Sequence, residues 1–350
     1  MLTRFSICIP AFNRPRELAD LLDSIASEPP GDWEIVISED CSPKGPEISD
    51  LARQFARDHS LLNVRFLTSP ANLGYDGNLR FLIDHADGRY CVFMGDDDLW
   101  RPGALEKLTK ATEANPDVGV ILRAWQTISK ETGEVLDVHR YFAGDRIFKP
   151  GPETAAAFFR RSVFVSGLAV STDAARAIST GEFDGTLLYQ LHLVGKILMT
   201  RPGYYLSQMT AVRRAGGEHY FGSSMSEHER FAPRQLTPEH SLNFVRGLFA
   251  IAQSLESAHG PLVGRLIRSD IARYSYPLLA IQARTSTRSS FQRYAASLSE
   301  LGLGRYWSFH IYRAALSVAG FRICDRTINA LKRLFGSTPV MSGTRGVRVS

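Results

Sequence analysis

Three aspartates, Asp96, Asp97 and Asp98, stand side by side directly after the apolar run from Tyr90 to Met94. Ionised together they repel one another, so they need a countercharge or raised pKa values. A hard divalent cation supplies that charge and prefers oxygen ligands, and Mg²⁺ or Mn²⁺ then completes its shell with water and substrate phosphates. The alternative is that an aspartate caps the helix expected after Pro102, or lies solvated in a turn. The triplet predicts a metal and phosphate site, with capping left open.

The segments around the triplet alternate between strand and helix. Apolar, β-rich runs predict strands at 5–9, 34–37, 64–67, 90–94 and 118–122. Apolar residues at helical spacing predict helices over 16–27, 48–55, 79–86 and 103–114. Strands joined by helical crossovers form a mostly parallel sheet with helices on both faces, so we expect an α/β fold.

Four polar loops follow the predicted strands, at 10–14, 38–42, 69–74 and 95–98. Ligands of such sheets bind beyond the carboxyl ends of the strands, where these loops gather. We therefore expect the four loops to meet at one edge of the sheet and to form the active site there.

Composition excludes several classes of protein. Hydrophobic residues at 44% and charged residues at 22% are typical of a globular chain. The four scattered cysteines form no CxxC pair, which argues against disulfides and zinc and favours a reducing cytosol. We find no signal pattern and no apolar stretch of about 18 residues, so export and membrane spanning are not expected. The absence of GxxxxGK[ST], and of GxGxxG after the first strand, disfavours a P-loop or dinucleotide-binding protein.

The carboxyl-terminal part differs in character. Helical spacing begins near residue 238 and continues to about 335, which predicts a helical region over 236–337 after a catalytic domain at 1–235, with a flexible tail at 338–350. Residues 301–350 hold eight Lys or Arg and one acid, which gives this segment a charge of +7. The net charge of the chain is +5, so the remaining residues together carry about −2. A basic amphipathic helix at 306–335 fits an anionic membrane surface, or equally a helix packed on its own domain. Without a recognised module, no nucleic acid is expected.

Four motifs carry a resemblance to a known family. They are SICIPAFNRP at the first strand, EIVISEDCSP at the second, NLGYDGN after the third and CVFMGDDDLWRPGAL at the fourth. In this order and spacing they resemble the family 2 glycosyltransferases of GT-A fold, and in particular the abequosyltransferase-like enzymes of bacterial surface polysaccharide synthesis. The resemblance covers residues 3 to 125, and more weakly extends to about 215.

The resemblance implies a set of nucleotide-sugar-binding residues. The first loop and the acidic pair after the second strand would hold the nucleotide, Gly74 would let the backbone approach it, and Asn78 would close over it. With a basic pair at 213–214 expected to meet the diphosphate, the predicted set is Pro10, Ala11, Phe12, Asn13, Arg14, Glu39, Asp40, Gly74, Asn78, Asp96 and Arg213.

The acidic triplet matches the metal-binding DxD motif of the family with one departure. The first aspartate of the usual form falls on Gly95, so Asp97 matches the usual metal ligand, Asp96 would replace the missing carboxylate, and Asp98 matches the acid after the motif. His219 would reach the metal or merely pack on the surface. The implied cofactor is Mn²⁺ or Mg²⁺, which neutralises the leaving diphosphate.

The family inverts the sugar by direct displacement and uses a carboxylate of the second half as the base. That carboxylate commonly lies in a Glu-Asp pair before a helix, which this sequence lacks. The nearest counterpart is TGEFDGTLLYQLHL, where Asp184 is the candidate base and Glu182 the reserve, although Asp184 would equally cap the helix at 187–194. The run at 162–171, interrupted by Gly167, would lie beside the acceptor.

The leading prediction is a metal-dependent inverting transferase that moves a sugar from a nucleotide donor to a lipid-linked glycan. It would be cytoplasmic, with peripheral attachment to the inner face of the plasma membrane left open. The irregular DxD motif and the missing Glu-Asp pair keep open a non-catalytic nucleotide-sugar or glycan-binding protein. A metal-dependent phosphate hydrolase is disfavoured, because the first loop lacks an aspartate nucleophile.

Overall fold

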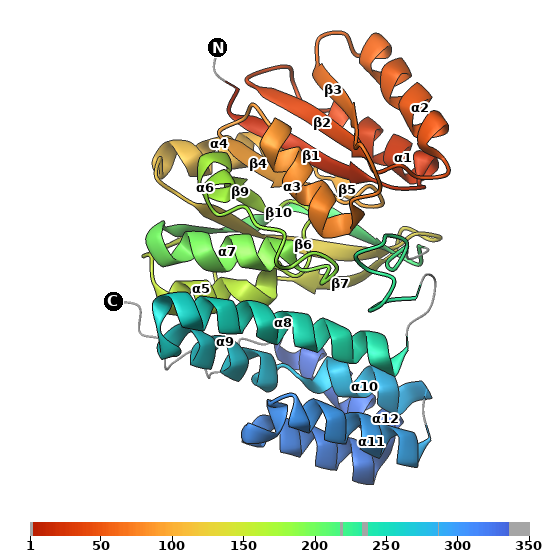
Figure 1. Ribbon diagram of the computed structural model, residues 1–350, viewed down its shortest axis with the longest axis vertical. Helices are drawn as coiled ribbons and strands as arrows, with labels where there is room; N and C mark the ends of the chain where they lie inside the picture. Colours follow the sequence, from red (N-terminus) through yellow and green to blue (C-terminus); the bar gives the residue numbers. More distant parts are fainter. Residues whose placement is uncertain (1–2, 218–219, 233–236, 286, 336–350) are drawn as a thin grey trace.

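The computed structural model describes residues 3–335 except 218–219, 233–236 and 286. Its amino-terminal part is the predicted alternation of strand and helix (Figure 1). Four strands pair in parallel in the order β3-β2-β1-β4. The strands are β1 (Phe5–Ala11), β2 (Trp33–Glu39), β3 (Asn63–Thr68) and β4 (Tyr90–Phe93), and the helices that connect and follow them are α1 (Pro15–Ala26), α2 (Gly45–Asp58), α3 (Gly74–His85) and α4 (Ala104–Ala114).

Alternate side chains of each strand enter cores on opposite faces of the sheet, as the two-residue period of a strand requires. From β1, Ile7 and Ile9 pack with Leu18 of α1 on one face. Cys8 packs with Leu79 and Leu82 of α3 on the other. Because both faces are covered, β1, β2 and β4 are buried almost throughout, whereas β3 at the edge of the sheet is partly exposed.

The sheet becomes mixed beyond β4, so the prediction of a mostly parallel sheet holds for its first half only. β9 is inserted antiparallel between β4 and β6, whereas β6 and β10 are parallel. Antiparallel strands flank them: β5 and β8 pair with β10, and β7 pairs with β6. These strands are β5 (Leu99–Trp100), β6 (Val120–Ser129), β7 (Val135–His139), β8 (Arg146–Phe148), β9 (Ala169–Ser171) and β10 (Gly203–Ala215).

The β-rich run at 162–171 forms a strand only over its last three residues. A 3₁₀ turn, η1 (Arg160–Ser162), precedes it, and Gly167 has a left-handed backbone with φ of 82°. A Cβ at that position would lie 2.6 Å from the Thr210 hydroxyl oxygen, so the chain turns where only glycine fits.

Helices form the second half of the molecule. α5 (Pro152–Phe159), α6 (Thr172–Ala177) and α7 (Tyr189–Thr200) lie on one face of the sheet, and the predicted helical region follows. That region consists of α8 (Pro238–His259), α9 (Pro261–Arg273), α10 (Tyr276–Thr285), α11 (Arg288–Glu300), η2 (Leu303–Arg305) and α12 (Trp307–Phe335), which has a kink at Gly320. The predicted tail at 338–350 lies outside the described residues. No helix among the described residues is long and apolar enough to cross a membrane.

The helical region shares its core with the sheet domain. Figure 1 places α5 and α7 between the sheet and α8 and α9, with α10, α11 and α12 furthest away. One cluster of buried side chains runs from Leu122 of β6 through Leu191 of α7 and Leu248 of α8 to Phe309 of α12. The predicted boundary at residue 235 therefore marks a change of architecture within a continuous core.

Candidate active site

A cavity of about 610 Å³ lies beyond the carboxyl ends of the parallel strands. All four predicted loops line it, through residues such as Phe12, Asp40, Gly74 and Asp97. A hollow of about 400 Å³ shares Phe12 with it and is also lined by Asn13 and Cys41. The parallel register brings these loops together, because every strand of the first half ends at the same edge.

Backbone strain is concentrated around these cavities. Within the described part of the chain, three non-glycine residues have positive φ: Asn13 at 64°, Cys41 at 51° and Leu187 at 64°. All three line one of the two cavities. Such strain costs free energy and tends to persist where a ligand site needs it, so this edge of the sheet is the candidate active site.

The opposite wall of the larger cavity comes from outside the four strand loops. Part of it is the 162–171 run that was predicted to lie beside the acceptor, and part comes from helices that sequence reasoning did not assign to the site. The loop at 163–165 and Leu187 form part of it. The helical region adds Phe244 from α8 and Leu278 and Ile281 from α10. The cavity thus has a polar side made by the strand loops and a largely apolar side completed by the carboxyl-terminal helices.

The three adjacent aspartates point in different directions. Asp96, 3% exposed, accepts a hydrogen bond from the Phe12 N–H at 2.9 Å and pairs with Arg14 at 2.8 Å. Asp98, 5% exposed, accepts hydrogen bonds from the Ser166 hydroxyl and the Arg214 N–H. Asp97 keeps 31% of its side chain exposed and meets Arg14 at 3.3 Å. All three residues line the cavity, but Asp96 and Asp98 hold neighbouring loops and Asp97 is the one that keeps solvent access.

Burial sets the protonation of the two inner carboxylates. Burial raises the pKa of Asp96 to about 6, although the Arg14 guanidinium opposes this. Burial and then the charge of Asp97 raise the pKa of Asp98 to about 7. The structure thus resolves the repulsion within the triplet by an arginine at Asp96 and by a raised pKa at Asp98.

The predicted metal ligands do not form a closed cage. In the described part of the chain, no three His, Cys, Asp or Glu side chains converge on a common point that a metal would occupy, and His219 lies outside the described residues. Mg²⁺ and Mn²⁺ sites in nucleotide-dependent enzymes often use one or two carboxylates, with the substrate phosphates supplying further ligands. Asp97 fits that kind of open site, whereas Asp96 and Asp98 already serve other partners.

The two arginines at the end of β10, Arg213 and Arg214, make different contacts. Arg214 donates to the Asp97 carbonyl oxygen at 2.7 Å and to the Glu17 carbonyl oxygen at 3.2 Å, and it pairs with Asp20. It fastens the acidic turn to α1. Both arginines line the cavity, and Arg213 is the exposed one, so it is the member of the pair that is free of the acidic turn and can meet an incoming anion.

The acidic pair after β2 also has two different roles. The Glu39 carboxylate accepts from the Cys41 N–H at 3.1 Å and the Ser42 N–H at 2.7 Å, so it shapes its own loop and is not part of the cavity lining. Asp40 lines the cavity and accepts from the Leu73 and Gly74 N–H groups at 2.7 and 2.9 Å. Burial raises the pKa of Asp40. This carboxylate joins the second and third loops.

A glycine is required at position 74 because the 222–227 segment packs closely against it. Its φ is 73°, and a Cβ there would lie 2.5 Å from the Ser224 hydroxyl oxygen and 2.9 Å from Glu227 Oε1. Glu227, 4% exposed, accepts from the Tyr75 N–H at 2.8 Å and the Gly222 N–H at 2.8 Å. The glycine allows the 222–227 segment to close against the start of α3. No feature of the sequence marked Glu227.

Two residues that line the cavity carry an amide oxygen that has no partner among the described residues. Asn78, 2% exposed, donates through Nδ2 to the Ser38 carbonyl oxygen at 3.2 Å, and its Oδ1 is buried without a hydrogen bond in the part of the chain that the structure describes. Gln190 of α7, 1% exposed, donates through Nε2 to the Val163 carbonyl oxygen at 3.1 Å, and its Oε1 is likewise unsatisfied within the described residues. These donations fix which end of each amide is oxygen. An unsatisfied buried acceptor costs about 1–3 kcal/mol, so each is suited to a ligand hydroxyl or N–H.

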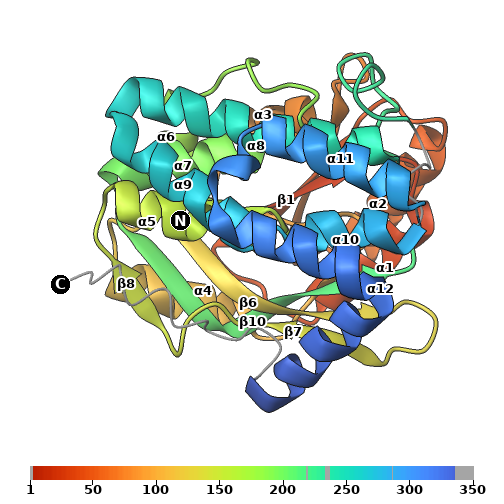
Figure 2. The same ribbon diagram turned by 90° about the horizontal axis from the view of Figure 1, so that it is seen from below.

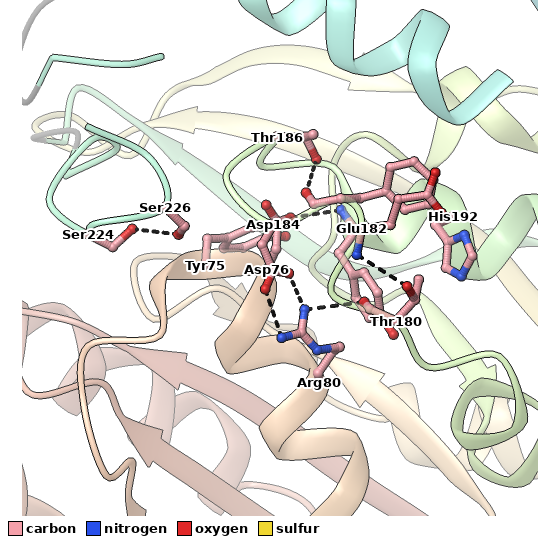
Figure 3. A network of polar contacts seen from close by, with 12 residues as sticks. Tyr75, Asp76, Arg80, Thr180, Glu182, Asp184, Thr186, His192, Ser224 and Ser226 are labelled. Carbon is pink, nitrogen blue, oxygen red and sulfur yellow. Dashed lines mark hydrogen bonds and ion pairs between the residues drawn. The ribbon is translucent and has the colours of Figure 1, made fainter. Parts of the chain in front are cut away.

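The candidate base lies apart from the cavity lining. The Arg80 guanidinium of α3 donates hydrogen bonds to both carboxylate oxygens of Asp184, whose side chain is 27% exposed (Figure 3). Glu182 is exposed, and its N–H donates to the Thr180 hydroxyl at 3.2 Å. Neither side chain lines the cavity. Asp184 does not cap α7 either, because the Leu187 and Tyr189 N–H groups at its start donate to Asp76, both at 2.8 Å.

The amino-terminal residues 6–165 match the family described as Glycosyl transferase family 2. The match covers a little under half of the chain, and this part is similar to the family 2 glycosyltransferases. The chain is 30% identical over 141 residues to the abequosyltransferase RfbV of Salmonella typhimurium, a match that covers 39% of this chain and 40% of that protein. It is 30% identical over 113 residues to the Campylobacter jejuni enzyme named GalNAc(5)-diNAcBac-PP-undecaprenol beta-1,3-glucosyltransferase, over 32% of this chain and 36% of that one. The chain thus spans less than half the length of each.

Solved glycosyltransferases share the fold over nearly the whole chain. Staphylococcus aureus TarS 1-349 in complex with UDP superposes with a TM-score of 0.57 at 13% identity, over 93% of this chain and 91% of that one. The mannosyltransferase PcManGT of Pyrobaculum calidifontis, solved with GDP-Man and Mn2+, gives 0.52 at 15% identity over 90% and 87%. The predicted GT-A fold is confirmed, and the matched length includes the helices after the glycosyltransferase domain.

Proposed function

We propose that this glycosyltransferase is a metal-dependent, inverting enzyme that moves a sugar from a nucleotide sugar to a hydroxyl of a lipid-linked glycan during assembly of a bacterial surface polysaccharide. The relatives' names support the acceptor class, since one is named for an undecaprenol-diphosphate-linked glycan. TarS with UDP and PcManGT with GDP-Man support the donor class.

The observation that carries the proposal is the cavity at the strand ends. On its polar side, Asp97 and Arg213 face the space in which a diphosphate would lie. Arg14 holds Asp96 and Asp97 from the first loop. Asn78 offers an unsatisfied acceptor to the nucleoside or the sugar. Carboxylate, guanidinium and amide groups at one edge are the set that a nucleotide sugar requires.

Asp97 would hold the metal. A bound Mn²⁺ or Mg²⁺ supplies positive charge to the leaving diphosphate as a Lewis acid. Asp97 suits this role because it lines the cavity, keeps solvent access and lies beside Gly217, whose Cβ position is 3.8 Å from Asp97 Oδ2. Asp96 and Asp98 contribute by fixing the turn on either side of it.

In transfer, the acceptor hydroxyl oxygen attacks the anomeric carbon while the bond from that carbon to the diphosphate oxygen breaks, and the hydroxyl proton must pass to a base. Gln190 is placed to hold that hydroxyl, because its unsatisfied Oε1 lies in the wall between the loop at 163–165 and α7. An amide does not take up the proton, so Gln190 is a positioning residue in this proposal.

A second candidate function, a non-catalytic nucleotide-sugar or glycan-binding protein, is favoured by the state of Asp184. The first candidate base, Asp184, is held by Arg80, and neither Asp184 nor the reserve, Glu182, lines the cavity. For Asp184 to act, the ion pair with Arg80 would have to open when the acceptor binds. The two candidate functions therefore differ in whether bound donor is turned over.

A panel of nucleotide sugars with Mn²⁺ tests the proposal. We expect one donor to raise the melting temperature and to be hydrolysed slowly. Asp184→Asn should lower hydrolysis while donor stabilisation is retained, and Arg80→Met, which breaks the same ion pair but keeps the carboxylate, should not lower it. Stabilisation without any turnover would favour the binding protein. Absence of stabilisation by every donor would overturn both candidates.

A further inference from the structure

An apolar stripe on α12 faces away from the protein. Trp307 is 76% exposed, Ile311 is 53% exposed and Val318 is 87% exposed. Spacings of four and seven residues place all three on one face of the helix. Phe309 and Leu316, on the opposite face, are buried in the shared core. α12 is therefore apolar both where it packs and where it meets solvent.

This exposure is concentrated. Four of the twelve large hydrophobic side chains that are exposed in the described part of the chain lie on α12, the fourth being Ile323 beyond the kink. Single exposed apolar residues need no explanation, whereas a contiguous group usually marks an interaction surface. Seen from below in Figure 2, α12 runs across the outer side of the helical region.

The charges next to the stripe select its partner. Arg305, Arg322 and Arg326 are exposed on or beside α12. Residues 301–335 contain six Lys or Arg and a single acid, Asp325. Two copies of this surface would bring like charges together, which disfavours a second copy of the chain as the occupant. Phospholipids with anionic headgroups satisfy the arginines and at the same time accept apolar side chains below the headgroups.

The stripe is also connected to the cavity through α10. The rings of Tyr276 and Tyr312 lie 5.8 Å apart, and the Tyr312 hydroxyl donates to the Arg273 carbonyl oxygen at 2.9 Å. α10 in turn supplies Leu278 and Ile281 to the apolar wall of the cavity, and Ile281 is itself 51% exposed. One helix thus contacts both α12 and the cavity.

We propose that the outer face of α12, formed by Trp307, Ile311 and Val318 and flanked by Arg305, Arg322 and Arg326, lies on the surface of an anionic lipid bilayer. The apolar side chains enter the interface and the arginines pair with lipid phosphates. The helix lies in the plane of the interface and does not span it. As a consequence that rests on the proposed function, the α10 wall of the cavity is brought to the side from which a lipid-linked acceptor enters.

Co-sedimentation of the full chain with vesicles tests this proposal. We expect binding to phosphatidylcholine vesicles that contain phosphatidylglycerol, and much weaker binding to phosphatidylcholine alone. Arg322→Ala with Arg326→Ala should weaken binding to the anionic vesicles about thirtyfold, since each basic residue near the surface contributes about fivefold. Trp307→Ser with Val318→Ser should weaken it about tenfold.

Leu61→Ser provides a matched control, because Leu61 is 82% exposed at the far side of the sheet domain; this variant should bind as the unaltered chain does. Equal binding by the α12 variants, or no vesicle binding at all, would overturn the proposal. So would a dimer in sedimentation velocity that the Trp307 and Val318 substitutions dissociate, since the stripe would then serve a second copy. Donor-induced thermal stabilisation, measured on the same variants, should be unchanged, which separates this proposal from the proposed function.

Discussion

At the scale of single residues, this protein gives neighbouring side chains of one type different tasks. Asp96 and Asp98 are buried and hold loops, and Asp97 between them is the one of the three that keeps solvent access in the cavity. Arg213 and Arg214 repeat the pattern, because successive side chains of a strand point to opposite sides. Substitutions at adjacent positions should therefore have separable effects on ligand binding and on stability.

Asp97→Asn should lower metal-dependent donor hydrolysis about a hundredfold while the melting temperature stays close to that of the unaltered chain. The amide has the same size but lacks the charge that a divalent cation requires. Hydrolysis as a function of Mn²⁺ concentration is the measurement. Activity equal to that of the unaltered protein would remove Asp97 from the metal site.

Arg213→Ala should weaken donor binding about tenfold, the loss expected for one hydrogen bond to a charged group, without changing the free energy of unfolding. Arg214→Ala is the matched comparison. It should lower the free energy of unfolding by about 2 kcal/mol, because the Asp97 and Glu17 carbonyl oxygens and Asp20 lose their donor. Titration calorimetry and urea unfolding of both variants would check the difference, and identical effects would contradict it.

At the scale of elements, one buried carboxylate joins two helices of the site. Asp76, in the first turn of α3, accepts the N–H groups of Leu187 and Tyr189 at the start of α7 (Figure 3). This contact positions Gln190 and the left-handed Leu187 in the cavity wall. Arg80 and Asp184 repeat the connection one turn further along α3.

Asp76 should make stability depend on pH in a predictable direction. Burial raises the pKa of Asp76 to about 7, whereas the pKa of an aspartate in an unfolded chain is about 3.9. Between these values the native state holds a proton that the unfolded state releases, so this group lowers the free energy of unfolding as pH rises.

The free energy of unfolding of the unaltered chain minus that of Asp76→Asn should therefore decrease from about pH 4 to about pH 7. Urea unfolding at several pH values measures this difference, in which the contributions of Asp96 and Asp98 cancel. A difference that stays constant over this range would contradict the assignment.

At the scale of the whole molecule, the helical region and the sheet domain behave as one body. Leu255 of α8 is fully buried and packs against Gly195 of α7, where a Cβ would lie 2.5 Å from the leucine side chain. The small residue lets the two helices approach closely. The helical region thereby supports both the core and the apolar wall of the cavity.

Leu255→Ala should lower the stability of the entire chain by about 3 kcal/mol, the cost of a cavity in a well-packed core. Tryptophan fluorescence, with Trp33, Trp100 and Trp125 in the sheet domain, and far-ultraviolet circular dichroism should report one coincident transition, shifted together. Two separate transitions, with only the helical one shifted, would mean that the regions fold independently.

The sequence by itself determined the first half of the fold and the edge at which the site lies. The parallel strands and their helices fall where the apolar spacing predicted them, because β1, β2 and β4 are buried on both faces and each loop is polar. The DxD-like turn and the first three loops could be found for the same reason, since they follow directly from strand ends.

Only the tertiary structure decided what each polar group does. The sequence predicts that Asp184 is a base or a helix cap. In the structure its carboxylate forms an ion pair with Arg80, which is 104 residues away in the chain. Gln190 carries no sequence signal, yet its unsatisfied oxygen lies in the cavity wall because Val163 fixes the other end of its amide. The apolar wall depends on α8 and α10. Periodicity reports which residues are buried, whereas the partner of a buried polar group is set by contacts between distant segments, which local spacing does not encode.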